Sequence, residues 1–201
     1  MCSLPRTVQY CKQAYHLRNL VHRISLDRPR MSYTIDQLNS MSQADFTQVL
    51  GDVFEHTPAI AHQAWQHRPF RDCAALHECM VTIVQAMNHD QQLALIQAHP
   101  DLGSRTAMAE ASVQEQTSAG LQQLTPHEYD RFQHLNQAYR ERFNFPFIVA
   151  VKHHTKESIL QAFATRLTHT PEQEYQQAIA EINQIALARL TALIAPTEVA
   201  D

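Results

Sequence analysis

The sequence predicts an all-α fold: a single compact domain of about seven or eight helices, with one short extended buried segment near residues 145–151. Two observations support this. Through most of the chain, apolar residues recur at the three-and-four spacing of a buried helical face. The chain also has only three glycines in 201 residues, which argues against a glycine-rich β-barrel.

The first half of the domain carries clear helix boundaries. We expect helices over about residues 43–55, 59–67, 74–87 and 89–99. Ser42, followed three residues later by Asp45, is an N-cap pattern, and Asn88 can cap the fourth helix. That helix should end at His99, because Pro100 disfavours the α conformation of the residue before it.

The second half begins its helices with threonine and proline. We expect helices over about residues 126–142, 156–167 and 171–193. Thr125-Pro126 and Thr170-Pro171 each combine an N-cap hydroxyl with a proline at the first helical position. Between them, residues 144–151 are apolar and β-branched. A single strand would have no partner here, so we interpret them as an extended buried segment.

Charge divides the chain unevenly. Residues 1–30 carry six basic side chains and one acid, whereas residues 31–201 carry ten basic and nineteen acidic groups. We expect residues 1–30 to be a basic extension that is poorly ordered or lies upstream of the true start at Met31. Residues 31–195 should form the domain, and residues 196–201 a tail.

The acidic domain excludes several classes of partner. Nucleic acids are bound largely through Lys and Arg, so we expect no nucleic-acid partner. No apolar run is long enough to span a membrane, and no glycine-rich phosphate loop is present. The chain lacks a secretory signal and the Ser-Lys-Leu ending of peroxisomal import, so we expect a cytoplasmic protein.

Thirteen histidines raise the question of a metal site. No H-E-x-x-H string occurs, and His77-Glu78 lacks the second histidine of that pattern. His89-Asp90 is a match of only two letters to a metal-binding dyad. We therefore expect no metal, and a metal-dependent amide hydrolase is the weakest functional hypothesis.

Three segments combine reactive side chains with breaks in the helical pattern: residues 99–103, 112–116 and 145–151. His99 at a helix C-terminus would feel the negative end of the dipole, which favours its protonated form, or it merely bonds the last carbonyls. Ser112 and Glu115 have the spacing of a capping box, and Gln116 could face a ligand. The third segment could read an amide-rich molecule through its main chain, or be plain core.

Taken together, these strings resemble the OHCU decarboxylase family. The resemblance rests on His-Pro-Asp-Leu-Gly at residues 99–103, Ser-Val-Gln-Glu-Gln-x-x-Ala-Gly-Leu at 112–121, and Asn136-x-x-Tyr139-x-x-x-Phe143-x-Phe-Pro-Phe-Ile-x-Ala-Val. It also includes Arg166-Leu167 and Phe-Glu-His-Thr-Pro at 54–58, and spans residues 33–193. Ala59 and His153 depart from it, where the family often has tryptophan and glycine.

The resemblance implies an activity and a set of roles. Family members convert 2-oxo-4-hydroxy-4-carboxy-5-ureidoimidazoline to (S)-allantoin, the last of three steps from urate, with an all-α fold and no metal or organic cofactor. His99 would be the proton donor, Glu115 the acid that orients the substrate, and Arg166 a guanidinium that binds its polar groups. The substrate-contacting positions would be Pro100, Ser112, Gln116, Phe147, Ile148, Val149, Ala150 and Val151.

The leading hypothesis is therefore a cofactor-free carboxy-lyase of urate degradation, whose partner is a small ureidoimidazoline. The alternative from another class is a non-catalytic helical module that binds a ureide or purine. The long C-terminal helix has an apolar stripe that could serve a homodimer interface as well as the core.

Overall fold

The computed structural model describes residues 32–104 and 110–196 of the chain. The helices in these residues are α2 (Ile35–Ser40), α3 (Gln43–Leu50), α4 (Pro58–Ala64), α5 (Cys73–Ala86), α6 (His89–Gln97), α7 (Glu110–Ser118), α8 (Pro126–Phe143), α9 (Lys156–Arg166) and α10 (Pro171–Leu193). The described part contains no named strand, so the predicted all-α fold is confirmed. The prediction for residues 1–30 lies outside the described residues.

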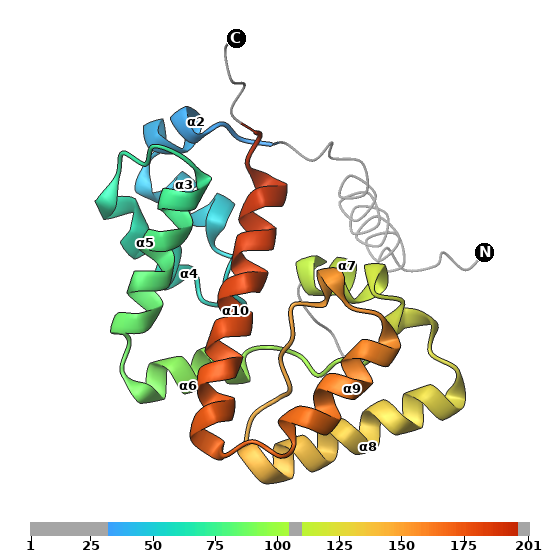
Figure 1. Cartoon of the computed structure of the whole chain (residues 1–201). Coiled ribbons are helices and arrows are strands. Elements are labelled where there is room, and N and C mark those ends of the chain that lie inside the picture. The colour runs from blue at the N-terminus through green and yellow to red at the C-terminus, as the bar shows by residue number, and fades with distance from the viewer. Residues whose placement is uncertain (1–31, 105–109, 197–201) are drawn as a thin grey trace, which may run out of the picture. The chain divides into compact units, whose positions relative to one another are not determined.

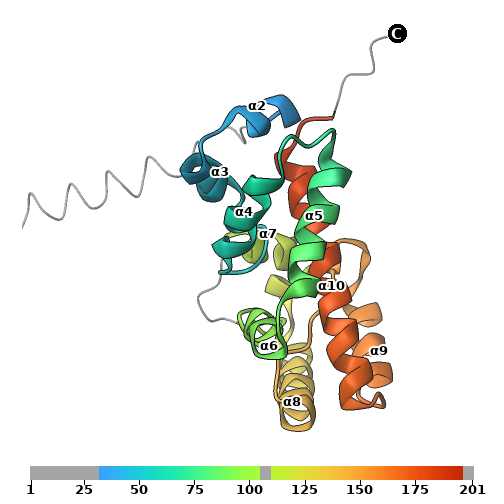
Figure 2. The same ribbon diagram turned by 90° about the vertical axis from the view of Figure 1, so that its left-hand side faces the viewer.

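The long helix α10 is the axis of the domain (Figure 1). Helices α2 to α6 lie on one side of it, and α7 to α9 lie on the other, with α8 lowest in this view. The turned view shows α5 running alongside α10 (Figure 2). Helix α10 thus packs against helices from both halves of the domain, among them α5, α6 and α8.

The two ends of the domain meet at one point. Tyr33 and Ile194 form an isolated parallel bridge. The N–H of Tyr33 donates to the carbonyl of Leu193 at 2.8 Å, and the N–H of Ala195 donates to the carbonyl of Tyr33 at 2.9 Å. This pairing fixes the C-terminal end of α10 against the first residues of the domain.

Most helix starts follow the predicted capping chemistry. Thr125 and Thr170 each accept from the backbone N–H three residues later, and proline follows each of them. Asn88 forms a capping box with Gln91. Because each cap satisfies backbone donors that a helix start leaves unpaired, these sequence signals placed the helix starts well.

The structure differs from the prediction near the first helix. α3 ends at Leu50, not near residue 55, and Gly51 follows as its C-cap. Val53 and Phe54 are buried, as the apolar spacing suggested, but they lie in a bend of the chain and not in a helix. Glycine has a low helix propensity, and the apolar spacing of the next turn imitated a longer helix. The short helix α2 was not predicted.

An aromatic cluster fills the core between α8, α9 and residues 145–151. Phe147 and Phe163 stack with ring centroids 3.7 Å apart, and Tyr139 meets Phe147 edge-on at 5.1 Å. Phe132 closes the cluster against Phe163 at 6.2 Å. The predicted segment is thus buried by aromatic packing instead of by a neighbouring strand. It ends one residue earlier than predicted, because Val151 begins the short 3₁₀ helix η3 (Val151–His153).

No helix in the described ranges is both long and apolar enough to cross a membrane.

Replacing the central ring of this cluster should destabilise the domain strongly. Phe163 is fully buried, so we expect Phe163→Ala to lower the free energy of unfolding by about 3–5 kcal/mol, the usual cost of a buried aromatic truncation. Urea denaturation followed by circular dichroism measures this. Gln161→Ala, at an exposed position of the same helix, is the control and should change stability by less than about 0.5 kcal/mol.

Candidate active site

A recess opens where the loop after α6, helix α7, residues 145–151 and α10 come together. It has about 350 Å³ of empty space, part of which is open to solvent. Its lining residues are His99, Pro100, Leu102, Ser112, Glu115, Gln116, Phe147, Ile148, Val149, Val151, Ile185 and Arg189. The structure thus brings together nearly all of the residues that the sequence singled out.

His99 lies in the recess at the end of α6 and is buried, with 6% of its surface exposed. A carbonyl oxygen can only accept, so Nδ1 of His99 donates to the carbonyl of Leu95 at 2.9 Å. In the neutral ring this leaves Nε2 without a proton. The helix-end hydrogen bond considered from the sequence is therefore present, together with a place in the recess.

The charge of His99 differs from the sequence expectation. Burial lowers the pKa of His99 from 6.5 to about 4, because desolvation disfavours the charged ring. The hydrogen bond to Leu95 and the charge of Glu55 act in the opposite direction but do not outweigh it, and Arg189 lowers the pKa further. The position of His99 at a helix C-terminus was not enough to predict its charge, because that argument left out the cost of desolvation.

Three contacts hold the loop that follows His99. Nε of Arg140 donates to both carboxylate oxygens of Asp101, at 2.8 and 3.1 Å. The amide of Asn136 donates to the carbonyl of Leu102, and Gly103 donates its N–H to Oε1 of Gln116, both at 2.9 Å. Gly103 adopts a left-handed φ of 67°, which lets the loop turn back towards α7.

Helix α7 contributes Ser112, Glu115 and Gln116 to the recess. It already includes Glu110, so Ser112 lies inside the helix, and the capping-box interpretation of Ser112 and Glu115 was wrong. Ser112 donates its hydroxyl proton to Oε2 of Glu55 at 2.8 Å. The spacing that imitates a capping box instead places two polar side chains on the face that meets α10.

Arg189 is the guanidinium of the recess, and all five of its N–H donors are used. Nε and Nη2 donate to the two oxygens of Glu115 at 2.8 and 2.9 Å, a bidentate pair. Nη1 donates to Oε2 of Glu55 at 2.9 Å and to the carbonyl of Asp52 at 3.0 Å. Nη2 also donates to Oγ of Ser112 at 3.0 Å.

Glu55 lies behind this group and is 1% exposed. Burial alone would raise its pKa, but the hydrogen bond from Ser112 and the charge of Arg189 together hold the pKa of Glu55 below its ordinary value. Its Oε1 has no hydrogen-bond partner among the described residues and lies 3.9 Å from Nε2 of His56. A buried carboxylate thus stays charged beside the recess and orients both Ser112 and Arg189.

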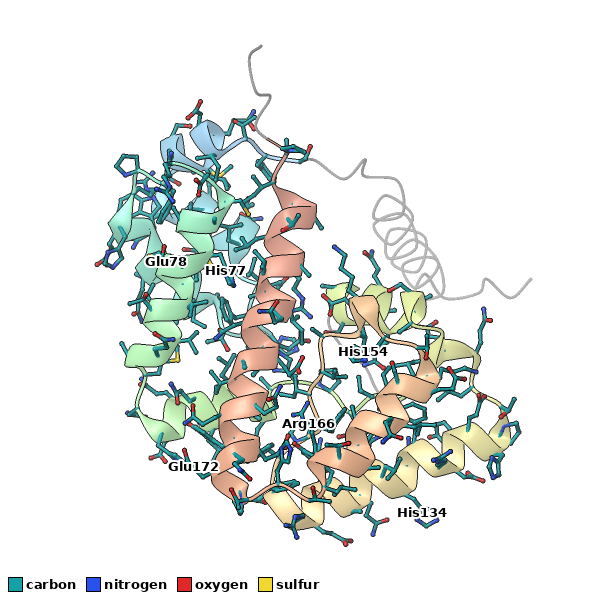
Figure 3. All side chains as sticks on the ribbon, in the orientation of Figure 1. His77, Glu78, His134, His154, Arg166 and Glu172 are labelled. Atoms are coloured by element: carbon teal, nitrogen blue, oxygen red, sulfur yellow. The ribbon has the colours of Figure 1, made fainter. Side chains whose placement is uncertain are left out.

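Two of the predicted site residues do not line the recess. Arg166, labelled in Figure 3, donates from Nε to Glu174 at 2.6 Å and from Nη1 to the carbonyl of Ile148 at 2.6 Å. Ala150 donates its N–H to Oε2 of Glu181 at 2.8 Å. Arg166 thus holds a carbonyl of the segment that contains Ala150, and Glu181 holds the N–H of Ala150. Neither Arg166 nor Ala150 is among the residues around the empty space.

Arg189 and Glu55 were missed as functional residues, although a signal for Arg189 exists. Arg189 follows Ile182 by seven residues and Ile185 by four, which places it on the buried face of α10. A charged residue in a core register must be paired. Arg166 follows Ile159 by seven residues and Phe163 by three, so it also lies on the buried face of α9, and register alone could not tell which arginine faces a ligand.

Within residues 32–104 and 110–196, no group of three or more His, Cys, Asp or Glu side chains is placed to hold a metal ion.

Known proteins resemble this chain over most of its length. The family model for OHCU decarboxylase matches residues 39–191. A 2-oxo-4-hydroxy-4-carboxy-5-ureidoimidazoline decarboxylase of Halalkalicoccus jeotgali is 42% identical, over 82% of this chain and 94% of that protein. The uric acid degradation bifunctional protein PucL of Bacillus subtilis is 45% identical, over 81% of this chain but only 33% of its own length.

Solved structures agree. A crystal structure of (S)-allantoin synthase superposes with a TM-score of 0.67 at 33% identity, covering 81% of this chain and 54% of that one, so the chain spans about half of its length. An OHCU decarboxylase crystallised in the presence of (S)-allantoin is 20% identical with a TM-score of 0.61, over 78% of this chain and 100% of that one, and shares the fold. With the family model matched over 153 of 201 residues and these relatives beside it, the chain belongs to the OHCU decarboxylase family.

Proposed function

We propose that this protein decarboxylates 2-oxo-4-hydroxy-4-carboxy-5-ureidoimidazoline to (S)-allantoin in urate degradation, with His99, Glu115 and Arg189 as the groups that act on the substrate. The observation that carries this proposal is their convergence on one recess. They come from the end of α6, from α7 and from α10, and they meet opposite the apolar wall of residues 147–151. The family to which the chain belongs supplies the reaction.

The reaction needs one proton. Loss of CO₂ from the carboxylate leaves an electron pair on the ring, and the product forms when a proton is added from one face. His99 is neutral in the empty recess near pH 7, since its pKa is about 4. A substrate carboxylate placed beside it would add negative charge and favour the imidazolium, which then donates from Nε2. Binding and protonation of His99 are thus coupled.

Glu115 and Arg189 together orient the substrate. Glu115 is the more exposed partner of Arg189, with 27% of its side chain accessible, whereas Glu55 is fully buried. All five donors of Arg189 are in use, so an incoming carboxylate or ureido group that binds Arg189 takes the place of Glu115 at this edge of the guanidinium. Glu55 and Ser112 keep the guanidinium fixed from behind, so its direction is set before the substrate arrives.

We also propose that the enzyme is cytoplasmic and forms a homodimer. The apolar stripe of α10 that suggested a dimer is buried within one chain, at Ile182, Ile185 and Leu190, so the sequence pattern supports the dimer without locating its interface. Light scattering of the purified protein tests the dimer, and a mass of one chain at micromolar concentration would contradict it.

His99 should be required for rate and handedness. We expect His99→Asn, whose amide can still donate to the Leu95 carbonyl, to lower kcat by about 10²- to 10⁴-fold, the usual contribution of general acid catalysis. Circular dichroism of freshly generated substrate follows (S)-allantoin directly, since uncatalysed decomposition gives the racemate. His134→Asn, at an exposed position of α8, is the control. An active His99→Asn variant, or wild-type protein that binds allantoin without accelerating decarboxylation, would contradict the proposal.

The fork geometry of Arg189 should matter more than its charge. Arg189→Lys keeps the positive charge but loses the bidentate pair with Glu115. We expect kcat/KM to fall at least about tenfold, while Arg131→Lys at an exposed position of α8 leaves it unchanged. Steady-state kinetics with a melting curve for each variant separates this loss from unfolding. Unchanged kcat/KM in a folded Arg189→Lys protein would remove Arg189 from the site.

Stability should depend on His99 at mildly acid pH. Because folding lowers its pKa from 6.5 to about 4, the unfolded chain binds more protons between these values, so His99 makes stability fall as the pH decreases through this window. We expect the loss of unfolding free energy between pH 7 and pH 5 to be smaller in His99→Asn than in the wild type. Urea titrations at both pH values measure it, and equal losses in the two proteins would contradict the lowered pKa.

A further inference from the structure

The irregular segment at residues 147–150, which leads into the 3₁₀ helix η3 (Val151–His153), has two distinct sides. On one side the carbonyl of Ile148 accepts from Nη1 of Arg166 at 2.6 Å, and the N–H of Ala150 donates to Oε2 of Glu181 at 2.8 Å. In extended backbone, residues two apart point their main-chain groups in the same direction. Arg166 and Glu181 do not line the recess, so this side of the segment is turned towards α9 and α10.

Val149 lies between these two tied residues, and we infer from the alternation of extended backbone that its main-chain groups point the other way. It lines the recess and is 4% exposed. In the described part of the chain, neither its N–H nor its C=O makes a hydrogen bond. Buried main-chain groups are almost always paired, so an N–H and a C=O beside an empty space form a donor and acceptor pair for a ligand. Amides and ureides carry the complementary pair.

The two anchors of the segment, Arg166 and Glu181, are themselves held by further contacts. Arg166 lies over the ring of Phe147, with its guanidinium carbon 4.4 Å from the centroid. Its partner Glu174 is fully buried and also accepts from Nδ1 of His169 at 2.9 Å. Oε1 of Glu181 accepts from the side-chain amide of Gln177 at 2.9 Å. Because each anchor has a second partner, neither can turn away without breaking another contact.

We propose that Arg166 and Glu181 are positioning residues that act through the main chain: they form a two-point clamp that fixes Val149 to present its N–H and C=O to the ureide part of the substrate. Arg166 thus receives a different role from the direct substrate contact expected from the sequence. This inference rests on the proposed decarboxylase function. The clamp would also decide which face of the ring lies towards His99, and hence the handedness of the product.

Glu181 offers the cleaner test, because its side chain is 18% exposed and its loss leaves no buried charge unpaired except through the 3.9 Å contact with Arg166. Glu181→Ala removes the acceptor for Ala150, whereas Glu181→Gln keeps an oxygen there. We expect Glu181→Ala to raise KM about tenfold with kcat within about threefold, as for loss of a contact made equally before and during the reaction. The enantiomeric excess of allantoin should also fall.

Glu181→Gln should restore KM and handedness, and Glu172→Ala, at an exposed position of the same helix (Figure 3), should leave both at wild-type values. Arg166→Lys provides a second variant: it keeps the charge for Glu174 but loses the fork that also reaches Ile148. It should show the same pattern of raised KM and lower enantiomeric excess.

Hydrogen exchange measured by NMR reads the clamp without reference to activity. The Ala150 amide should exchange at least about tenfold faster in Glu181→Ala than in Glu181→Gln. Wild-type protein without decarboxylase activity would overturn the proposed function. Active wild-type protein together with unchanged KM, handedness and Ala150 exchange in Glu181→Ala would overturn only the clamp, as would a Glu181→Gln variant as impaired as Glu181→Ala.

Discussion

The site depends on one buried guanidinium. Arg189 joins α10 to α7 through Glu115 and Ser112, and to the turn between α3 and α4 through Glu55 and the carbonyl of Asp52. A buried cation with all five donors paired is tolerated, whereas the loss of one partner would leave a costly unpaired charge. The same pairing that keeps Arg189 in the interior therefore fixes the relative positions of three chain segments around the recess.

A second buried arginine, Arg166, is also paired, but with different partners. Arg166 is as buried as Arg189, each with 6% of its surface exposed, but its partners are Glu174, Tyr139 and a main-chain carbonyl of the segment beside it. One arginine thus turns its charge towards the recess, and the other uses its charge to hold the wall of the recess. A main-chain segment without a partner strand needs such a support if it is to recognise a substrate as proposed above, because the segment cannot hold its own shape.

The fold could be predicted from local sequence signals, whereas the separate roles of the two site arginines could not. Thr125, Thr170 and Asn88 mark helix starts because the caps act over three residues. The loop at residues 99–103 and the segment at 147–151 stood out because they interrupt helical periodicity. The choice between Arg166 and Arg189 depends on how α9 and α10 pack, and the low pKa of His99 depends on burial; neither is encoded in local spacing.

The bridge between Tyr33 and Ile194 has a consequence for how the domain can be joined to other proteins. Because the domain is entered and left at the same point, a second protein can be joined to either end without passing over the helices that build the recess. The family occurs in that form, since the matching region makes up 33% of the bifunctional protein of Bacillus subtilis. Two hydrogen bonds far along the sequence from His99 thus place the two points at which another protein could be attached side by side.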